Sequence, residues 1–190
     1  LRMLPVITVV LGTRPEAIKL APVINKLKDK ENIRLRVVLT GQHKEMASDV
    51  IKLFNITEDN NLEIMREKQS LSYILSETLN GLKIEFKKYK PHLVIVQGDT
   101  STAFAAALSA FYEGIPVAHV EAGLRTNNLH EPFPEEANRR LISQVTSLHF
   151  APTKLSEINL LKSGVSGKIF VTGNTVIDSL LFIANKNINH

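Results

Sequence analysis

The sequence predicts an α/β domain with a Rossmann-like parallel sheet flanked by helices, and two observations lead to it. Short β-rich runs alternate with segments of helical periodicity along nearly all of the 190 residues. Strands that alternate with helices favour a parallel sheet joined by right-handed crossovers. In addition, 44% of the residues are hydrophobic, which is enough for one sizeable core. We therefore expect residues 1–190 to form a single domain.

Six β-rich runs are expected to be strands, because each is short and apolar and lies between helical patterns. In chain order they are Val6–Leu11, Leu35–Thr40, Leu93–Gln97, Val117–Val120, Ser147–Ala151 and Ile169–Thr172. We also consider a further short strand around Leu62–Met65.

Seven segments are expected to be helices. The segment over 71–88 is the clearest, because six large apolar residues from Leu71 to Phe86 lie on one stripe. Pro15 suits the first position of the first helix. In chain order the helices are Pro15–Lys28, Lys44–Phe54, Leu71–Lys88, Thr102–Glu113, Glu135–Gln144, Lys154–Lys162 and Val176–Ala184.

Composition excludes several classes of protein. The net charge is +4, but the lysines are scattered, whereas a nucleic-acid binder should show a clustered stripe, so we expect no nucleic-acid partner. No apolar run approaches the roughly 20 residues that cross a bilayer, and no signal peptide is evident. There are no cysteines, hence no disulfide or zinc-thiolate site. We expect a cytoplasmic protein without a membrane or metal partner.

Glycine spacing argues against a bound dinucleotide. Gly12 follows the first strand alone, without the Gly-x-Gly-x-x-Gly pattern of NAD sites or the Gly-Lys-Ser/Thr of a P-loop. We therefore expect no cofactor.

Charged residues follow the predicted strands at the points where the strands end. In parallel sheets these ends share one edge, where ligands bind. The residues expected at this edge are Asp99, Glu121, Arg14, Arg125 and His43, with Lys19 one turn into its helix. Arg14 and Lys19 lie near a helix N-terminus, which suits a multiply charged anion. Carboxylates beside cations suit proton transfer on a phosphate-bearing substrate.

Each acid also has a plainer interpretation. Asp99 suits a cap of the helix beginning near Ser101. Glu135 and Glu136 suit a first helical turn, and Glu135 with Arg139 suits a surface ion pair.

Glu121 resists such an interpretation. It follows an apolar strand and therefore requires a partner if it is buried. The candidate partners are Arg125, Arg139 and Arg14, whereas His119, inside the strand, is expected to be a core histidine.

Seven motifs in order carry a family resemblance that covers about residues 7–181. They are GTRPEAIKLAP, TGQHKEM, QGDTSTAFAAALSAFY, IPVAHVEAGLRT, PFPEEANRR, HFAPT and IFVTGNTVIDSLL. Together they resemble the N-terminal half of the non-hydrolysing UDP-N-acetylglucosamine 2-epimerases. The resemblance implies one half of a GT-B-type architecture, in which two Rossmann-like domains enclose the active site.

The resemblance also implies an activity and a set of site residues. The activity is interconversion of UDP-GlcNAc and UDP-ManNAc by elimination and re-addition of UDP through 2-acetamidoglucal. By match to the family motifs, the acid/base residues are Asp99, Glu121 and Glu135, and the supporting cations are Arg14, Lys19 and Arg139.

The resemblance further implies a homodimer and a C-terminal nucleotide-binding domain that this chain lacks, so we expect the chain alone to be inactive. In the family, the pair here occupied by Gln42 and His43 belongs to a second, activating UDP-GlcNAc site. Some members have arginine where this chain has Lys68 and glutamine where it has Glu45, which argues against activation here. Alternatives are a hydrolysing 2-epimerase, a non-catalytic binding or dimerisation domain and a GT-B glycosyltransferase.

Overall fold

The computed structural model describes residues 3–41 and 46–188 and contains seven strands and seven helices in those ranges. They are β1 (Val6–Leu11), α1 (Arg14–Lys28), β2 (Arg34–Leu39), α2 (Met46–Leu53), β3 (Asn60–Asn61), α3 (Leu71–Tyr89), β4 (Leu93–Gln97), α4 (Ser101–Tyr112), β5 (Val117–Val120), α5 (Glu135–Val145), β6 (Leu148–Ala151), α6 (Lys154–Lys162), β7 (Lys168–Val171) and α7 (Val176–Ile188).

All strands pair in parallel in one sheet of order β3-β2-β1-β4-β5-β6-β7. The order reverses direction at β1, as in doubly wound folds, because the chain first moves outward through β2 and β3 and then crosses to β4. The Rossmann-like fold class predicted from the sequence is confirmed.

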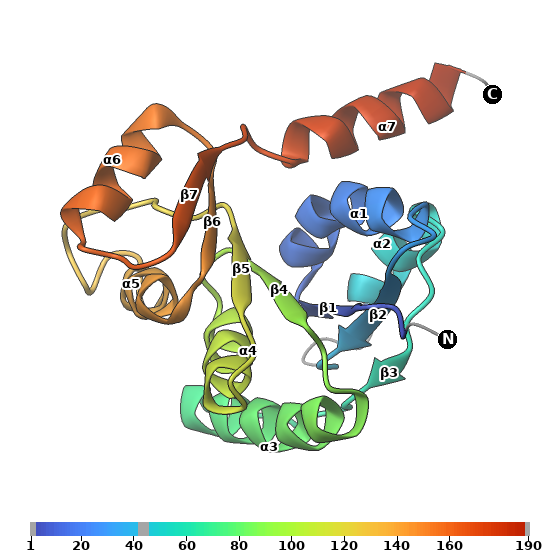
Figure 1. The fold of residues 1–190 in the computed structure, drawn as a ribbon, viewed down its shortest axis with the longest axis horizontal. Helices are drawn as coiled ribbons and strands as arrows, with labels where there is room; N and C mark the ends of the chain where they lie inside the picture. The colour runs from blue at the N-terminus through green and yellow to red at the C-terminus, as the bar shows by residue number, and fades with distance from the viewer. Residues whose placement is uncertain (1–2, 42–45, 189–190) are drawn as a thin grey trace.

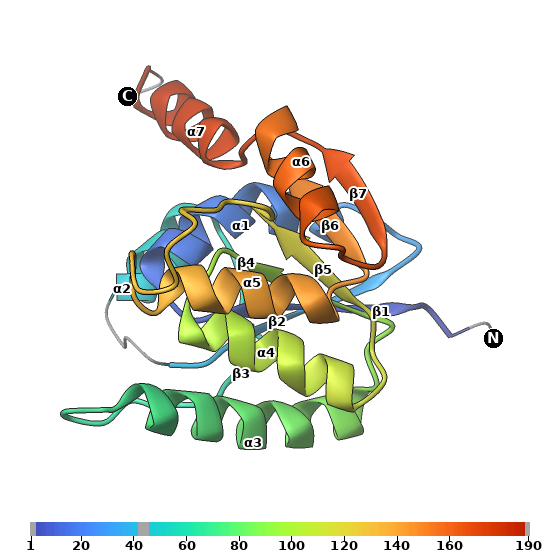
Figure 2. The same ribbon diagram turned by 90° about the vertical axis from the view of Figure 1, so that its left-hand side faces the viewer.

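Two helical layers cover the sheet. Helices α1, α2 and α7 lie on one face, and α3, α4 and α5 lie on the other (Figure 1). Alternate residues of each strand point to opposite faces, so Val9 and Leu11 belong to the first core and Val10 to the second. Figure 2 shows α3, α4 and α5 beneath the sheet and α7 above it.

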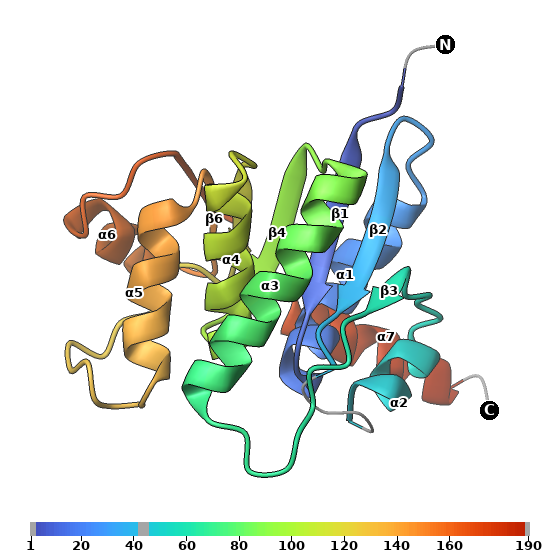
Figure 3. The ribbon, with the colours of Figure 1, turned by 90° about the horizontal axis from the view of Figure 1, so that it is seen from below.

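Helix α4 packs at the centre of the second layer because its inner face is built from alanines. Ala105, Ala106, Ala107 and Ala110 are fully buried, and such short side chains let a helix approach the sheet closely. Figure 3 shows α4 between α3 and α5.

The strand considered around Leu62–Met65 is wrong in position, since the short strand is Asn60–Asn61. Glu63 has a left-handed backbone with φ 51°, which ends the extended conformation. Leu62 N still donates to Leu39 O at 2.8 Å, so the segment stays beside β2 without forming a strand.

None of the helices in the described ranges combines the length and hydrophobicity that crossing a bilayer requires.

Candidate functional site

The carboxyl edge of the sheet brings Glu121 together with residues from three other elements. Lys19 Nζ of α1 lies 2.8 Å from Glu121 Oε1, and Gln97 Nε2 at the end of β4 lies 3.3 Å from the same oxygen. Asn174 Nδ2, between β7 and α7, donates to Oε2 at 2.7 Å. The carboxylate is 9% exposed, and its pairing partner Lys19 is 25% exposed. This set of donors holds the carboxylate in one orientation.

The partner of Glu121 therefore differs from the three arginines considered from the sequence. Lys19 takes this position because it lies about one turn into α1, which begins at the same edge of the sheet where β5 ends. The sequence places Lys19 near the edge but not opposite Glu121, since the two are 102 residues apart.

Asn174 and Gln97 were missed as site residues. Asn174 follows a strand end at the same edge, and that position was the available signal.

Glu121 has a strained backbone, with φ at 65° in a residue that is not glycine. Gly123 follows with φ at 93°, and a Cβ there would lie 2.3 Å from Ser156 O. The turn after β5 is thus fixed against α6, and it turns the Glu121 side chain toward α1.

Asp99 is paired with Arg139. Asp99 Oδ2 lies 2.9 Å from Arg139 Nη2, and Asn138 Nδ2 donates to Asp99 O at 2.9 Å. The capping interpretation of Asp99 is wrong, because the cap of α4 is Thr100, whose hydroxyl accepts from Ala103 N.

Burial raises the pKa of Asp99 above its ordinary value. The Arg139 charge opposes this shift, while the carboxylates of Glu135 and Glu121 raise the pKa further. Glu121 and Glu135 are therefore both close enough to Asp99 to act on its charge.

Glu135 begins α5 and is half-buried, and Arg139 lies one turn further along the helix. The predicted surface pair between Glu135 and Arg139 is wrong, because Arg139 is buried and pairs with Asp99 and, at 3.5 Å, with Glu136. Arg14, the first residue of α1, is exposed and forms no ion pair among the described residues. Both Glu135 and Arg14 thus remain available to a ligand at the edge.

Glu16 joins two of the loops that carry the site. It is 2% exposed and accepts hydrogen bonds from Gly12 N at 3.1 Å and Thr100 Oγ1 at 2.9 Å. Gly12 packs against the start of α4, since a Cβ there would lie 2.4 Å from Thr102 Cγ2. Glu16 also accepts from Thr13 N, so one buried carboxylate caps the start of α1 and fixes the position of the α4 start.

Glu136 is a structural residue of the loop before α5. It is fully buried and accepts from Arg140 Nε at 2.8 Å and Thr126 N at 3.1 Å. Burial by itself would raise the pKa of Glu136, but these hydrogen bonds and the nearby Arg139 charge lower it below its ordinary value.

Arg125 does not join the carboxylates at the edge, contrary to expectation. It turns toward α5 and α6, where Nη2 lies 3.2 Å from Ser143 Oγ and 3.4 Å from Ser163 Oγ. The sequence could not distinguish these directions, because Arg125 lies beyond the turn at Gly123.

His119 is a buried core residue, as expected. Its Nε2 lies 2.6 Å from Gly98 O, and burial lowers its pKa to about 4. A histidine held neutral in this way supports the strand ends rather than exchanging protons with a ligand.

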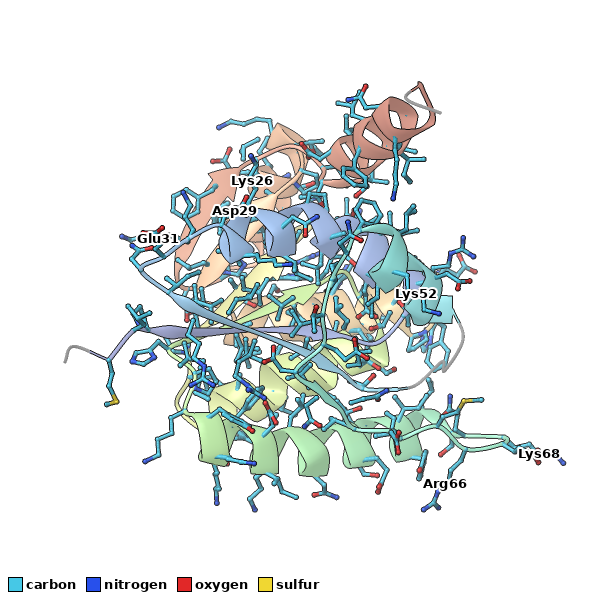
Figure 4. The ribbon with its side chains drawn as sticks, turned by 90° about the vertical axis from the view of Figure 1, so that its right-hand side faces the viewer. Lys26, Asp29, Glu31, Lys52, Arg66 and Lys68 are labelled. Carbon is cyan, nitrogen blue, oxygen red and sulfur yellow. The ribbon has the colours of Figure 1, made fainter. Side chains whose placement is uncertain are left out.

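Within the described ranges, no group of three or more His, Cys, Asp or Glu side chains is arranged to hold a metal ion. Gln42 and His43, the expected activating pair, and Glu45 lie outside the described residues. Lys68 and Arg66 lie on the loop before α3. Figure 4 shows this loop on one side of the molecule and the C-terminal end of α1, marked by Lys26 and Asp29, on the other.

Comparison with known proteins identifies similar chains. The family model for UDP-N-acetylglucosamine 2-epimerase matches residues 25–190. The UDP-N-acetylglucosamine 2-epimerase of Neisseria meningitidis is 52% identical over 178 residues, which cover 93% of this chain and 48% of that protein. A crystal structure of the Neisseria meningitidis enzyme bound to UDP-GlcNAc superposes with a TM-score of 0.90 at 50% identity, covering 96% of this chain and 50% of that one.

A more distant structure shares the fold alone. A lipopolysaccharide outer core galactosyltransferase is 14% identical with a TM-score of 0.62, covering 87% of this chain and 44% of that one. The chain spans about half the length of the curated relatives it matches.

Proposed function

This chain belongs to the UDP-N-acetylglucosamine 2-epimerase family, and we propose that it forms the N-terminal domain of an enzyme that interconverts UDP-GlcNAc and UDP-ManNAc. The observation that carries the proposal is the Glu121 cluster, in which Lys19 and Asn174 fix a buried carboxylate at the ligand-binding edge. The crystal structure of a relative of 50% identity contains bound UDP-GlcNAc, which supports this substrate.

The chemistry explains why several acids are needed. The hydrogen on carbon 2 of the sugar is not next to a carbonyl, so its direct removal would give no stabilised carbanion. Elimination of UDP to 2-acetamidoglucal avoids that intermediate. Re-addition of UDP, with the proton delivered to the other face of carbon 2, then inverts this centre. Both directions require a proton acceptor and a proton donor at fixed positions.

Asp99, Glu121 and Glu135 form the proposed acid/base set. Lys19 and Asn174 hold the Glu121 carboxylate in one orientation, which suits a proton acceptor, whereas burial raises the pKa of Asp99, which suits a donor. Different environments around neighbouring carboxyls are the usual way in which one site provides both roles.

Arg14, Lys19 and Arg139 are the proposed supporting cations. Arg14 is exposed at the α1 N-terminus, where main-chain N–H groups and the helix dipole also favour an anion. We assign Arg14 to the departing diphosphate, while Lys19 and Arg139 hold Glu121 and Asp99 in place.

We propose that a second domain, corresponding to the other half of the relatives, completes the cleft, so that this domain alone does not turn over. The test is an NMR assay with UDP-GlcNAc in deuterated water, using the chain alone and a chimera with the remaining half of the Neisseria meningitidis relative. We expect the chimera to form UDP-ManNAc with deuterium at carbon 2 and the chain alone to form no product.

Each other result contradicts part of the proposal. Free ManNAc would identify a hydrolysing 2-epimerase. Binding of UDP-GlcNAc by a folded chimera without any product would identify a non-catalytic domain. UDP-ManNAc formed by the chain alone would contradict the requirement for a second domain.

A further inference from the structure

A polar cavity of about 430 Å³ lies between α5 and α6, and Arg125 and Asn127 from the segment after β5 also line it. Arg140, Ser143 and Gln144 line it from α5, and Lys162 lines it from α6. Figure 3 shows these two helices side by side at one end of the layer. The only large apolar side chain among the lining residues is Leu141, so the cavity suits a polar occupant.

Three of the lining residues are cations, and none is a carboxylate. Arg140 donates through Nε to Glu136 at 2.8 Å, and that buried carboxylate is shared with Arg139. Arg125 and Lys162 have no carboxylate within ion-pair distance among the described residues. Two of the three cations thus lack an ion-pair partner among the described residues, and the third shares the Glu136 carboxylate with Arg139.

Arg125 is the most constrained of the three. Its Nη1 donates to Leu124 O at 2.8 Å, and its Nη2 reaches the hydroxyls of Ser143 and Ser163. Those hydroxyls donate in turn to main-chain carbonyls, so both hold Arg125 as acceptors. Neutral acceptors alone leave the guanidinium charge uncompensated.

One donor of Arg125 is also unused. Its Nε is buried and has no hydrogen-bond partner among the described residues. Leaving a buried charged donor unpaired is costly, and an anion bound beside the guanidinium would offset its charge electrostatically. A purely structural role for Arg125 explains its two serine contacts. It does not explain the unpaired Nε, or why Arg140 and Lys162 line the same cavity.

The charge and the size of the cavity define the chemical class of the occupant. Arginine and lysine together suit phosphate oxygens, since arginine gives forked hydrogen bonds and lysine a point charge. No aromatic side chain lines the cavity to stack on a nucleotide base. We propose that this cavity binds a free phosphate-class oxyanion, inorganic phosphate or pyrophosphate, through Arg125, Arg140 and Lys162.

The test follows the arginine Nε–H signals in ¹H–¹⁵N NMR spectra of the full chain during titration with pyrophosphate. Each signal is assigned from the corresponding substitution. We expect saturable shifts of the Arg125 and Arg140 signals. Arg140→Gln and Lys162→Gln should each weaken the response of Arg125 about tenfold, because each removes a charge-assisted contact.

The matched control is Lys83→Gln, which removes one exposed positive charge from α3 and should leave the affinity unchanged. Both cavity variants alter exposed or half-exposed side chains, and unchanged thermal melting would confirm that they fold. The proposal fails if Arg125 does not respond, or if the cavity variants and Lys83→Gln weaken binding equally. It also fails if UDP shifts the Arg125 signal at lower concentration than pyrophosphate, which would assign the cavity to a nucleotide.

Discussion

At the residue scale, Glu121 combines two features that a purely structural acid does not need. Its backbone lies in the left-handed region, and its carboxylate is fixed by Lys19 and Asn174 from separate elements. Strain of this kind persists only where the surroundings enforce one conformation. The surroundings of Glu121 thus fix the position of the carboxylate that we propose as an acid/base group.

Glu121→Gln in the two-domain chimera should lower turnover by about 100-fold or more, because the amide cannot accept a proton at this position. Turnover is measured as UDP-ManNAc formed from UDP-GlcNAc. The matched control is Glu58→Gln, which changes an exposed acid away from the edge. Turnover of a folded Glu121→Gln chimera close to that of the control would remove Glu121 from the acid/base set.

His119 gives a pH-dependent contribution to stability. Its pKa is about 4 in the folded chain, because burial favours the neutral ring, against about 6.5 when unfolded. The unfolded state therefore binds the proton more readily, and stability falls as the pH drops from 6.5 toward 4. By pH 5 the loss relative to pH 8 is about 2 kcal/mol.

The measurement compares the free energy of unfolding in urea at pH 8 and pH 5 for the chain and for His119→Asn. The difference between the two proteins should shrink by about 2 kcal/mol at pH 5. The comparison is needed because burial raises the pKa of Asp99 and Glu16, which acts in the opposite direction. A difference that does not change with pH would show that His119 titrates normally.

At the element scale, the turn after β5 is fixed by contact with α6. A Cβ at Gly123 would lie 2.3 Å from Ser156 O, a main-chain atom that cannot move without shifting the helix. Gly114, after α4, also has a positive φ, at 69°, but a Cβ there would meet nothing within 4 Å. An alanine at either position has the cost of the positive φ, but only an alanine at Gly123 also has the cost of the contact with α6.

Gly123→Ala should therefore destabilise the chain by about 1–3 kcal/mol more than Gly114→Ala, because only the first substitution forces atoms together. The free energy of unfolding in urea measures both. Equal losses for the two variants would show that the turn adjusts freely beside α6.

The sequence predicted elements well where a periodic pattern was long. The six strands and seven helices expected from it are all present, with their ends shifted by a few residues. It placed the short strand wrongly, because two residues at Asn60–Asn61 carry no recognisable period and the left-handed Glu63 follows. A periodic pattern arises when one face of an element is buried, and an edge strand of two residues is too short to show such a pattern.

At the scale of the whole molecule, the chain exposes large apolar side chains on the outer helices. Ile84 of α3 is 71% exposed, Tyr112 of α4 is 70% exposed and Phe111 is 53% exposed. Burial of such side chains between two copies would stabilise an association. We propose that these side chains contribute to the homodimer that the family resemblance implies.

Sedimentation velocity of the chain should show a monomer–dimer equilibrium that Ile84→Glu or Tyr112→Glu shifts to monomer, since each would bury an unpaired charge. The control is Leu155→Glu on α6, where an equally exposed leucine is replaced outside this surface. A dimer that survives both α3 and α4 substitutions would place the interface elsewhere.

The sequence by itself determined the alternation of strands and helices, the parallel sheet and the placement of Asp99, Glu121, Arg14 and Lys19 at its carboxyl edge. These follow from local periodicity and from the rule that parallel strands end on one side. Only the tertiary structure decided which charges meet. It paired Glu121 with Lys19 and Asp99 with Arg139, and it turned Arg125 away to the α5–α6 cavity. Pairing depends on how far each helix extends past the sheet and on single turns such as the one at Gly123, and neither distance nor direction is encoded in residue spacing.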